Sequence, residues 1–422
     1  MNDMLYNIPK MKNGNELKDA IACLPEYDEN IRYADVNTRL ISLSDLYSIY
    51  IPSTMSIEIY NKLYLALIQS MQKKFTQLSV KQRYENNKMI QKQMANGILG
   101  GSDSFTIIGK SGIGKSSAIN HAVSLITENK LIEINYPYTK IIPCLTVQCP
   151  FDSSVKGLLL EILRMVDTIL ESDYYTTVRT SRSATVDMLI GMVSTIALNH
   201  IGLLIVDEIQ NVVNSKNGKN LIGALTQLIN NSGISICMVG TPECTKFFEQ
   251  AMQLARRSIG LKYTNMQYDD YFRYFCKIIF SYQYVKNKTN IDESIIEWLY
   301  NHTSGVTSVV ISLIHDAQEI SILNGSEILN LETLNEAYNT RLSMMHDYIK
   351  TQPSPQKKIR KNSGRNSCKD IYNSYNSYNY TKSDNDNDTK PLFDEIRTIS
   401  KKQNTNAINI IKNYYTVEEV DI

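Results

Sequence analysis

Short apolar runs alternate along this chain with longer stretches in which apolar residues recur every three or four positions. This alternation predicts an α/β fold, because short apolar runs form buried strands and the longer spacing forms helices packed on them. The predicted strands are residues 105–108, 140–148, 203–206, 234–239 and 261–263. The most membrane-like run, Met188 to Val206, is interrupted by Asn199, His200 and Gly202, and predicts a buried helix followed by a core strand rather than a membrane span.

The pattern divides the chain into four parts. Residues 1–95 show helical spacing and almost no glycine, and predict a helical N-terminal extension. The predicted strands fall in 96–267, and a helical region follows over 268–349. Residues 350–422 are polar, turn-rich and of low complexity, which predicts disorder over most of this tail. Its last stretch regains apolar residues and is either a partner-binding segment or simply a tail.

Composition sets limits on the class of protein. The chain has 422 residues and is 43% hydrophobic, which is enough for a large buried core. The 44 Lys and Arg nearly balance the 43 Asp and Glu, so a basic surface for nucleic acid must be local. Its seven Cys form no C-x-x-C pair and the start is polar, so we expect a cytoplasmic protein with no membrane contact.

The stretch SFTIIGKSGIGKSS, residues 104–117, carries the most specific chemistry. A β-branched apolar run meets a G-x-x-x-x-G-K-S sequence, which is the spacing of a phosphate-binding loop. Glycines let consecutive N–H groups point at phosphates, the lysine adds a positive charge, and the serine hydroxyl binds Mg²⁺. The predicted nucleotide-binding residues of this loop are Gly109, Gly112, Gly114, Lys115, Ser116 and Ser117.

A second acidic motif lies at LLIVDEIQ, residues 203–210. Four apolar residues followed by two carboxylates are typical of a buried parallel strand that ends at the carboxyl edge of a sheet, where nucleotide sites lie. We therefore expect Asp207 to hold Mg²⁺ through water, together with Ser116, and Glu208 to polarise the attacking water. ATP and Mg²⁺ are the predicted ligands.

Four further residues each allow two interpretations. Thr241, after the strand 234–239, is either a sensor of the γ-phosphate or part of a Gly-Thr-Pro turn. Arg256 and Arg257 either cap a helix or insert into the nucleotide site of a neighbouring subunit. Lys156 lies in a predicted first helical turn, where the macrodipole disfavours a cation, so it is either solvated or set against a polyanion.

In order along the chain, these motifs and the helical region that follows resemble an AAA+ ATPase with its lid. More narrowly, LPEYDENIRYADVNTRL, CPFDSSVKGLLLEIL, DEIQ, VGTPE and LARR resemble the TniB/TnsC-type ATPases of transposable elements, over about residues 20–345. The resemblance implies a P-loop AAA+ core with a five-stranded parallel sheet in the order 5-1-4-3-2. It also implies an ATP-hydrolysing regulator of transposition that forms a ring or filament on duplex DNA and connects target-selector proteins to a transposase.

Carried over by residue, the resemblance makes Glu208, Thr241 and Arg256 catalytic, with Arg256 acting as a finger in the neighbouring subunit. It assigns DNA contacts to Lys156 and, by a looser alignment, to Thr177. We also expect the nearby Arg179 and Arg182 to contact DNA. One position departs from the family: Val309 is the nearest match to the lid's usual sensor arginine, so either that arginine is not used or hydrolysis is slow. The alternative from another class is a nucleotide-gated P-loop scaffold that acts on protein partners only, and DNA binding through Lys156 would distinguish the two.

Overall fold

The computed structural model describes residues 8–346, except for 75, 101–103, 136–137, 181–184, 214, 246–247 and 249–258. The chain divides into two compact units, residues 1–356 and 357–422, and all described residues belong to the first. The predicted tail lies outside the described residues, as do Arg182, Arg256 and Arg257. The predicted boundaries of the four parts of the chain stay predictions.

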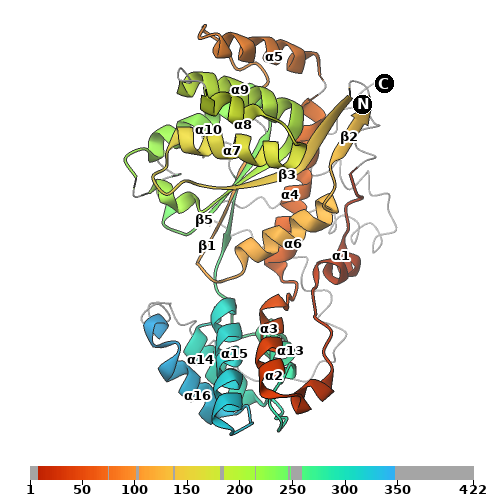
Figure 1. Cartoon of the computed structure of the whole chain (residues 1–422), viewed down its shortest axis with the longest axis vertical. Helices are drawn as coiled ribbons and strands as arrows, with labels where there is room; N and C mark the ends of the chain where they lie inside the picture. The colour runs from red at the N-terminus through yellow and green to blue at the C-terminus, as the bar shows by residue number, and fades with distance from the viewer. Residues whose placement is uncertain are drawn as a thin grey trace, which may run out of the picture. The chain divides into compact units, whose positions relative to one another are not determined.

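A six-stranded sheet forms the centre of the described unit (Figure 1). Its strands are β1 (Phe105–Gly109), β2 (Ile132–Asn135), β3 (Tyr138–Gln148), β4 (Ile201–Asp207), β5 (Ser235–Gly240) and β6 (Ile259–Tyr263). Their order is β2-β3-β4-β5-β1-β6. All neighbours pair in parallel except β2 and β3, which are antiparallel. The fold class is therefore the predicted α/β P-loop architecture.

The sheet departs from the prediction at one edge. The five predicted strands appear as β6-β1-β5-β4-β3, which is the expected order 5-1-4-3-2. The five parallel strands are confirmed, but β2 adds a sixth, antiparallel strand that was not predicted and makes the sheet mixed. This strand has only four residues, IEIN, so its alternation of apolar and polar residues is too short to be distinguished from a loop in the sequence.

Helices cover both faces of the sheet. Successive side chains of a strand point to opposite faces, so Leu203 and Ile205 of β4 pack with one cluster while Leu204 and Val206 pack with the other. The first cluster includes residues of α1 (Gly14–Ile21), α4 (Thr54–Lys73) and α6 (Lys115–Thr127). The second includes residues of α7 (Val155–Leu170), α9 (Val186–His200) and α10 (Gly218–Ser232), and α5 (Gln77–Ile90) and α8 (Tyr174–Thr180) pack on this side.

A separate helical lid has its own hydrophobic cluster. Its elements are α13 (Asp270–Ser281), α14 (Glu293–Thr303), α15 (Thr307–Asn324), α16 (Leu331–Thr340) and the short 3-10 helix η4 (Ser343–Met345). Part of the N-terminal segment completes this cluster: Leu43, Leu46, Ile49 and Ile51 are buried in it. That segment contains η2 (Glu29–Tyr33), α2 (Val36–Ser42) and α3 (Asp45–Ser48), which lie beside α13 and α15 in Figure 1.

The N-terminal segment is therefore shared between two bodies. The stretch from Leu43 to Ile51, which includes α3, packs with the lid, whereas α1 and α4 pack on the sheet. Ser53 separates them and begins α4 as a capping box, because its hydroxyl accepts a hydrogen bond from the Ser56 N–H and the Ser56 hydroxyl accepts one from the Ser53 N–H. The chain thus crosses between lid and core near Ser53 as well as after β6.

The predicted division of the run 188–206 into a helix and a strand is confirmed by α9 and β4. Among the described helices, none is by itself long and apolar enough to cross a membrane. The pair α14 and α15 reaches the required length and composition together, but the two helices are bent by 119°.

Candidate functional site

The phosphate loop connects β1 to α6 and adopts the backbone that its glycines allow. Gly112 has φ +76° and Gly114 has φ +93°, the left-handed region that residues with a Cβ rarely adopt. Gly114 is the N-cap of α6, and Lys115 and Ser116 form the first turn of this helix. The loop therefore places a helix N-terminus, a lysine and a serine together, as anion binding requires.

Lys115 is held by its own loop. Its Nζ donates to the carbonyl oxygens of Gly109 at 2.7 Å and Lys110 at 2.8 Å. Burial lowers the pKa of Lys115, and the nearby charges of Asp207 and Glu208 oppose this shift. The ammonium group is thus fixed beside the two acids, within reach of the space above the loop.

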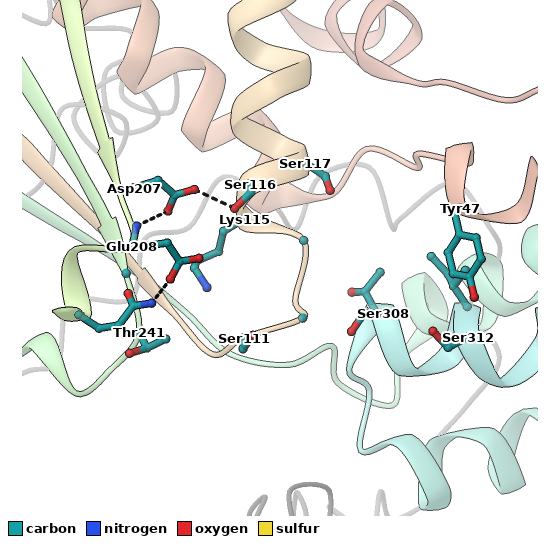
Figure 2. A pocket seen from close by; sticks show the side chains of 16 residues that line it. Tyr47, Ser111, Lys115, Ser116, Ser117, Asp207, Glu208, Thr241, Ser308 and Ser312 are labelled. Atoms are coloured by element: carbon teal, nitrogen blue, oxygen red, sulfur yellow. Dashed lines mark hydrogen bonds between the residues drawn. The ribbon is translucent and has the colours of Figure 1, made fainter. Parts of the chain in front are cut away.

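The carboxyl end of β4 brings Asp207 to the first turn of α6. The Ser116 hydroxyl donates to Asp207 Oδ2 at 3.1 Å, and the Glu208 N–H donates to Asp207 Oδ1 at 2.8 Å (Figure 2). Mg²⁺ usually takes one or two protein oxygens and keeps several waters. The Ser116 hydroxyl can be one such oxygen, and the Asp207 carboxylate beside it can accept a hydrogen bond from a bound water, so the residues present fit this ion.

Glu208 has an unusual backbone and a close partner. Its φ of +56° is left-handed, which costs energy for a residue with a Cβ and is often found at functional sites. The Gln210 side-chain amide donates a hydrogen bond to Glu208 Oε2. The sequence motif DEIQ contains Gln210, but its role as a partner of Glu208 was not predicted.

Thr241 follows β5 at the same edge of the sheet. Its hydroxyl oxygen is buried and has no hydrogen-bond partner in the part of the chain that the structure describes. A buried polar atom without a partner costs about 1–3 kcal/mol, so a ligand oxygen at this point would be stabilising. This placement fits the predicted phosphate sensor.

These groups line one cavity of about 350 Å³. The predicted residues on its wall are Gly112, Gly114, Lys115, Ser116, Ser117, Asp207, Glu208 and Thr241. Gly109 is not on the wall but supports it through the Lys115 hydrogen bond. The structure thus brings the predicted nucleotide-binding residues together from β1, α6, β4 and β5.

The opposite wall comes from the lid and was missed by the sequence analysis. Figure 2 shows Tyr47, Ser308 and Ser312 across the pocket from Asp207 and Glu208. The other lid residues on this wall are Thr307 and Ile311. Tyr47 comes from α3 and the others from α15, and Tyr47 also packs against the His315 ring, with the ring centroids 4.8 Å apart.

The lid contacts the phosphate loop directly. The Ser308 N–H donates to the Gly112 carbonyl oxygen at 3.0 Å, and the Thr307 hydroxyl donates to the Ile113 carbonyl oxygen at 3.4 Å. Val309, the predicted match to the sensor arginine, is only 1% exposed and belongs to the lid core. Its neighbour Ser308 lies on the pocket wall, and the expectation that Val309 stands in place of a sensor arginine stays a prediction.

The predicted DNA contacts lie elsewhere. Lys156 is exposed in the first turn of α7, and Thr177 and Arg179 are exposed on α8, which begins after the other end of α7. None of these three lines the nucleotide pocket. Their role in DNA binding stays a prediction, as does that of Arg182, and so does the finger role of Arg256.

Comparison with protein families matches residues 99–248 to the AAA domain family. This range contains the phosphate loop, the two acids and Thr241. This match supports an AAA+ ATPase and nucleotide hydrolysis in general. Comparison with curated proteins found no match.

Solved structures provide weaker similarity. The ORC1 protein of Aeropyrum pernix in complex with DNA is 12% identical with a TM-score of 0.41, over 64% of this chain and 66% of that chain. The Walker-type ATPase paby2304 of Pyrococcus abyssi is 11% identical with a TM-score of 0.36, over 64% and 76%. Drosophila ORC bound to DNA is 11% identical with a TM-score of 0.37, over 60% and 65%. The chain thus spans just under two thirds of the two ORC chains.

Proposed function

We propose that this protein is an ATP-dependent DNA-binding regulator of DNA transposition, which assembles on duplex DNA, hydrolyses ATP slowly and connects target selection to a transposase. The observation that carries the ATPase part is the 3.1 Å contact between Ser116 and Asp207, with Lys115 and Glu208 beside it. The DNA part rests on the exposed Lys156 and on the resemblance to TniB/TnsC-type ATPases.

Binding of ATP requires Lys115 to change partners. Its ammonium now satisfies two loop carbonyl oxygens, and a phosphate oxygen offers a stronger, charge-assisted hydrogen bond. Ser116 and Asp207 would hold Mg²⁺, which when bound neutralises charge that develops on the phosphates. The Thr241 hydroxyl gains the partner that it lacks.

The lid wall serves the base end of the nucleotide. The Tyr47 ring and the Ile311 side chain offer apolar surface, and Ser308 and Ser312 offer hydroxyl groups. This composition suits a purine base, which stacks on an aromatic ring and presents polar edges. Because Tyr47 and α15 belong to the lid, a bound nucleotide would join lid and core.

Glu208 orients the attacking water, and its contact with Gln210 sets the resting state. A carboxylate that accepts a hydrogen bond from an amide is a weaker base than a free one. Turnover therefore requires Glu208 to exchange this partner for water. Together with Val309 in the place where related lids carry an arginine, this contact favours slow hydrolysis.

Assembly on DNA provides the test. The full chain is mixed with ATP and duplex DNA, and the mass of the complexes is measured by analytical ultracentrifugation. We expect multimers on DNA with ATP and smaller species without it. An Arg256→Ala variant should keep the monomer fold and lose most ATPase activity, because a finger acting in trans contributes about 10³- to 10⁵-fold to the rate. The proposal would be contradicted if multimers form without DNA or nucleotide and if Arg256→Ala keeps full ATPase activity.

A further inference from the structure

Phe151 is the most exposed described phenylalanine, with 92% of its surface accessible. The other described phenylalanines are at most 8% exposed and belong to the hydrophobic clusters: Phe105, Phe248, Phe272, Phe275 and Phe280. Phe151 precedes α7 in the segment CPFDSSVK, residues 149–156. An aromatic ring in water at this point contributes nothing to the core, so its position needs another explanation.

A tight turn holds the backbone around Phe151. The Ser153 N–H donates to the Pro150 carbonyl oxygen at 2.9 Å, and the Ser154 N–H donates to Asp152 Oδ1 at 3.0 Å. Ser153 is buried and has φ +52°, a backbone conformation that costs energy for a serine. The chain is therefore held in a defined turn with Phe151 at its tip.

This turn is joined to the segment between β4 and α10 and to the first residues of α10, of which the structure describes residues 211–213 and 215–220. The Ser215 hydroxyl donates to the Asp152 carbonyl oxygen at 2.8 Å, and the Asn217 side-chain amide donates to the same oxygen at 3.3 Å. The Asn211 side-chain amide donates to the Cys149 carbonyl oxygen at 2.9 Å. The two segments therefore form one surface, which we call the Phe151 surface.

The Phe151 surface is basic. Its two segments contain three lysines, Lys156, Lys216 and Lys219, and one acid, Asp152, so the net charge is +2. All three lysines are exposed, and none has a carboxylate oxygen within 4.0 Å in the described parts of the chain. The Asp152 carboxylate accepts the Ser154 N–H. The cationic groups are therefore available to an anionic partner.

Cations and an exposed aromatic ring together meet the two chemical features of nucleic acid. Lysines neutralise phosphates at any sequence, whereas a ring stacks on a base or enters between bases. In an intact duplex the base faces already stack on each other, so the ring finds a partner only where bases are unpaired or unstacked. An acidic protein would pair with the lysines but would not explain the ring.

We propose that the Phe151 surface binds DNA at unpaired or unstacked bases, with Phe151 stacked on a base and with Lys156, Lys216 and Lys219 set against backbone phosphates. This inference rests on the proposed function, because it takes DNA as the ligand, and it adds a preference for distorted DNA. The preference depends on Phe151 alone, so a test can separate it from backbone binding.

The experiment measures the affinity of the full chain with ATP for two labelled DNAs, a perfect duplex and the same duplex with a three-base mismatched bubble. We expect the bubble to bind about tenfold more tightly, as a single stacked base provides. Phe151→Ala should remove this preference and leave duplex affinity nearly unchanged, and Phe151→Trp should keep it. Tyr274→Ala removes a ring that is 55% exposed on α13 and serves as the control that changes neither affinity.

The double variant Lys216→Ala, Lys219→Ala should bind both DNAs more weakly. The slope of log affinity against log salt concentration should become shallower by about two. Equal affinity of Phe151→Ala and wild type for the bubble would overturn the inference. If the wild type binds the duplex but does not prefer the bubble, only this inference fails. If it binds neither DNA with ATP, the proposed function fails with it.

Discussion

Arg39 and Glu327 form a buried ion pair that ties the N-terminal segment to the lid. Arg39 is 0% exposed, and its two terminal nitrogens donate to the Glu327 carboxylate at 2.6 and 2.7 Å. Arg39 also donates to the Tyr284 carbonyl oxygen at 3.1 Å, and the Lys286 N–H donates to Glu327 at 3.2 Å. Removal of Glu327 therefore leaves Arg39 with one carbonyl partner, whereas removal of Arg39 leaves Glu327 with the Lys286 N–H.

The contacts that remain determine the cost of each change. Removal of one partner of a buried pair costs about 3–5 kcal/mol of unfolding free energy. Glu327→Gln leaves the Arg39 charge buried, so we expect about 5 kcal/mol. Arg39→Met leaves Glu327 partly exposed with the Lys286 N–H and ammonium as partners, so we expect about 3 kcal/mol. The double variant should lose about 2 kcal/mol less than the sum, because the two residues are in contact.

Urea unfolding at pH 7 measures these free energies. Hydrogen bonds from Arg39 lower the pKa of Glu327, so the pair stabilises the fold above the ordinary carboxyl pKa and loses this effect as the pH falls. Because Tyr47 lies on the same segment, Arg39→Met should also weaken binding of a fluorescent ATP analogue. Additive costs in the double variant, or a larger loss for Arg39→Met than for Glu327→Gln, would refute the reasoning.

Three further changes probe other parts of the molecule. Glu208→Gln should keep ATP affinity and reduce phosphate release by about 10²- to 10⁴-fold, and an active variant would exclude Glu208 as the base. Burial lowers the pKa of Lys74 from 10.5 to about 7 in the folded protein. Between these two pH values Lys74 is protonated in the unfolded chain but largely neutral in the folded one, so the free energy of unfolding rises with pH. In urea unfolding between pH 7 and 9, the free energy of unfolding of the wild type should rise relative to that of Lys74→Met by up to about 1.4 kcal/mol per pH unit. A difference between the two proteins that does not change with pH would contradict this. Gly112→Ala places a Cβ 2.4 Å from Ser308 Oγ at a left-handed φ, and should raise the dissociation constant for ATP; an unchanged constant would show that the lid contact is dispensable.

The core half of the site could be predicted because its signals are local. The glycine spacing of the phosphate loop and the apolar run before Asp207 each lie within about ten residues, and strand ends of a parallel sheet meet at one edge. The order of the five parallel strands followed from the resemblance. The added edge strand β2 did not, because IEIN is too short to show a period.

The lid half could not be predicted, because its residues meet only through tertiary packing. Tyr47 lies far before the phosphate loop in the sequence and reaches the pocket because α2 and α3 pack on the lid. Ser308 and Val309 are neighbours in a helical turn, and only the direction of their side chains decides which one faces the nucleotide. Gln210 is a polar residue in a short helix. Its contact with the Glu208 carboxylate accompanies a left-handed φ at Glu208, which the sequence does not reveal.

The most direct test of the central claim is the affinity of duplex DNA for the full chain, measured by fluorescence anisotropy with and without ATP at several salt concentrations. We predict binding that requires ATP, does not depend on sequence and falls steeply with salt. Lys115→Ala should not bind DNA, because it no longer binds the nucleotide. Lys156→Ala should still bind the nucleotide, but the slope of log DNA affinity against log salt concentration should become shallower by about one per contact. Wild-type protein that binds no DNA with ATP, or Lys156→Ala that binds as wild type at every salt concentration, would contradict the account.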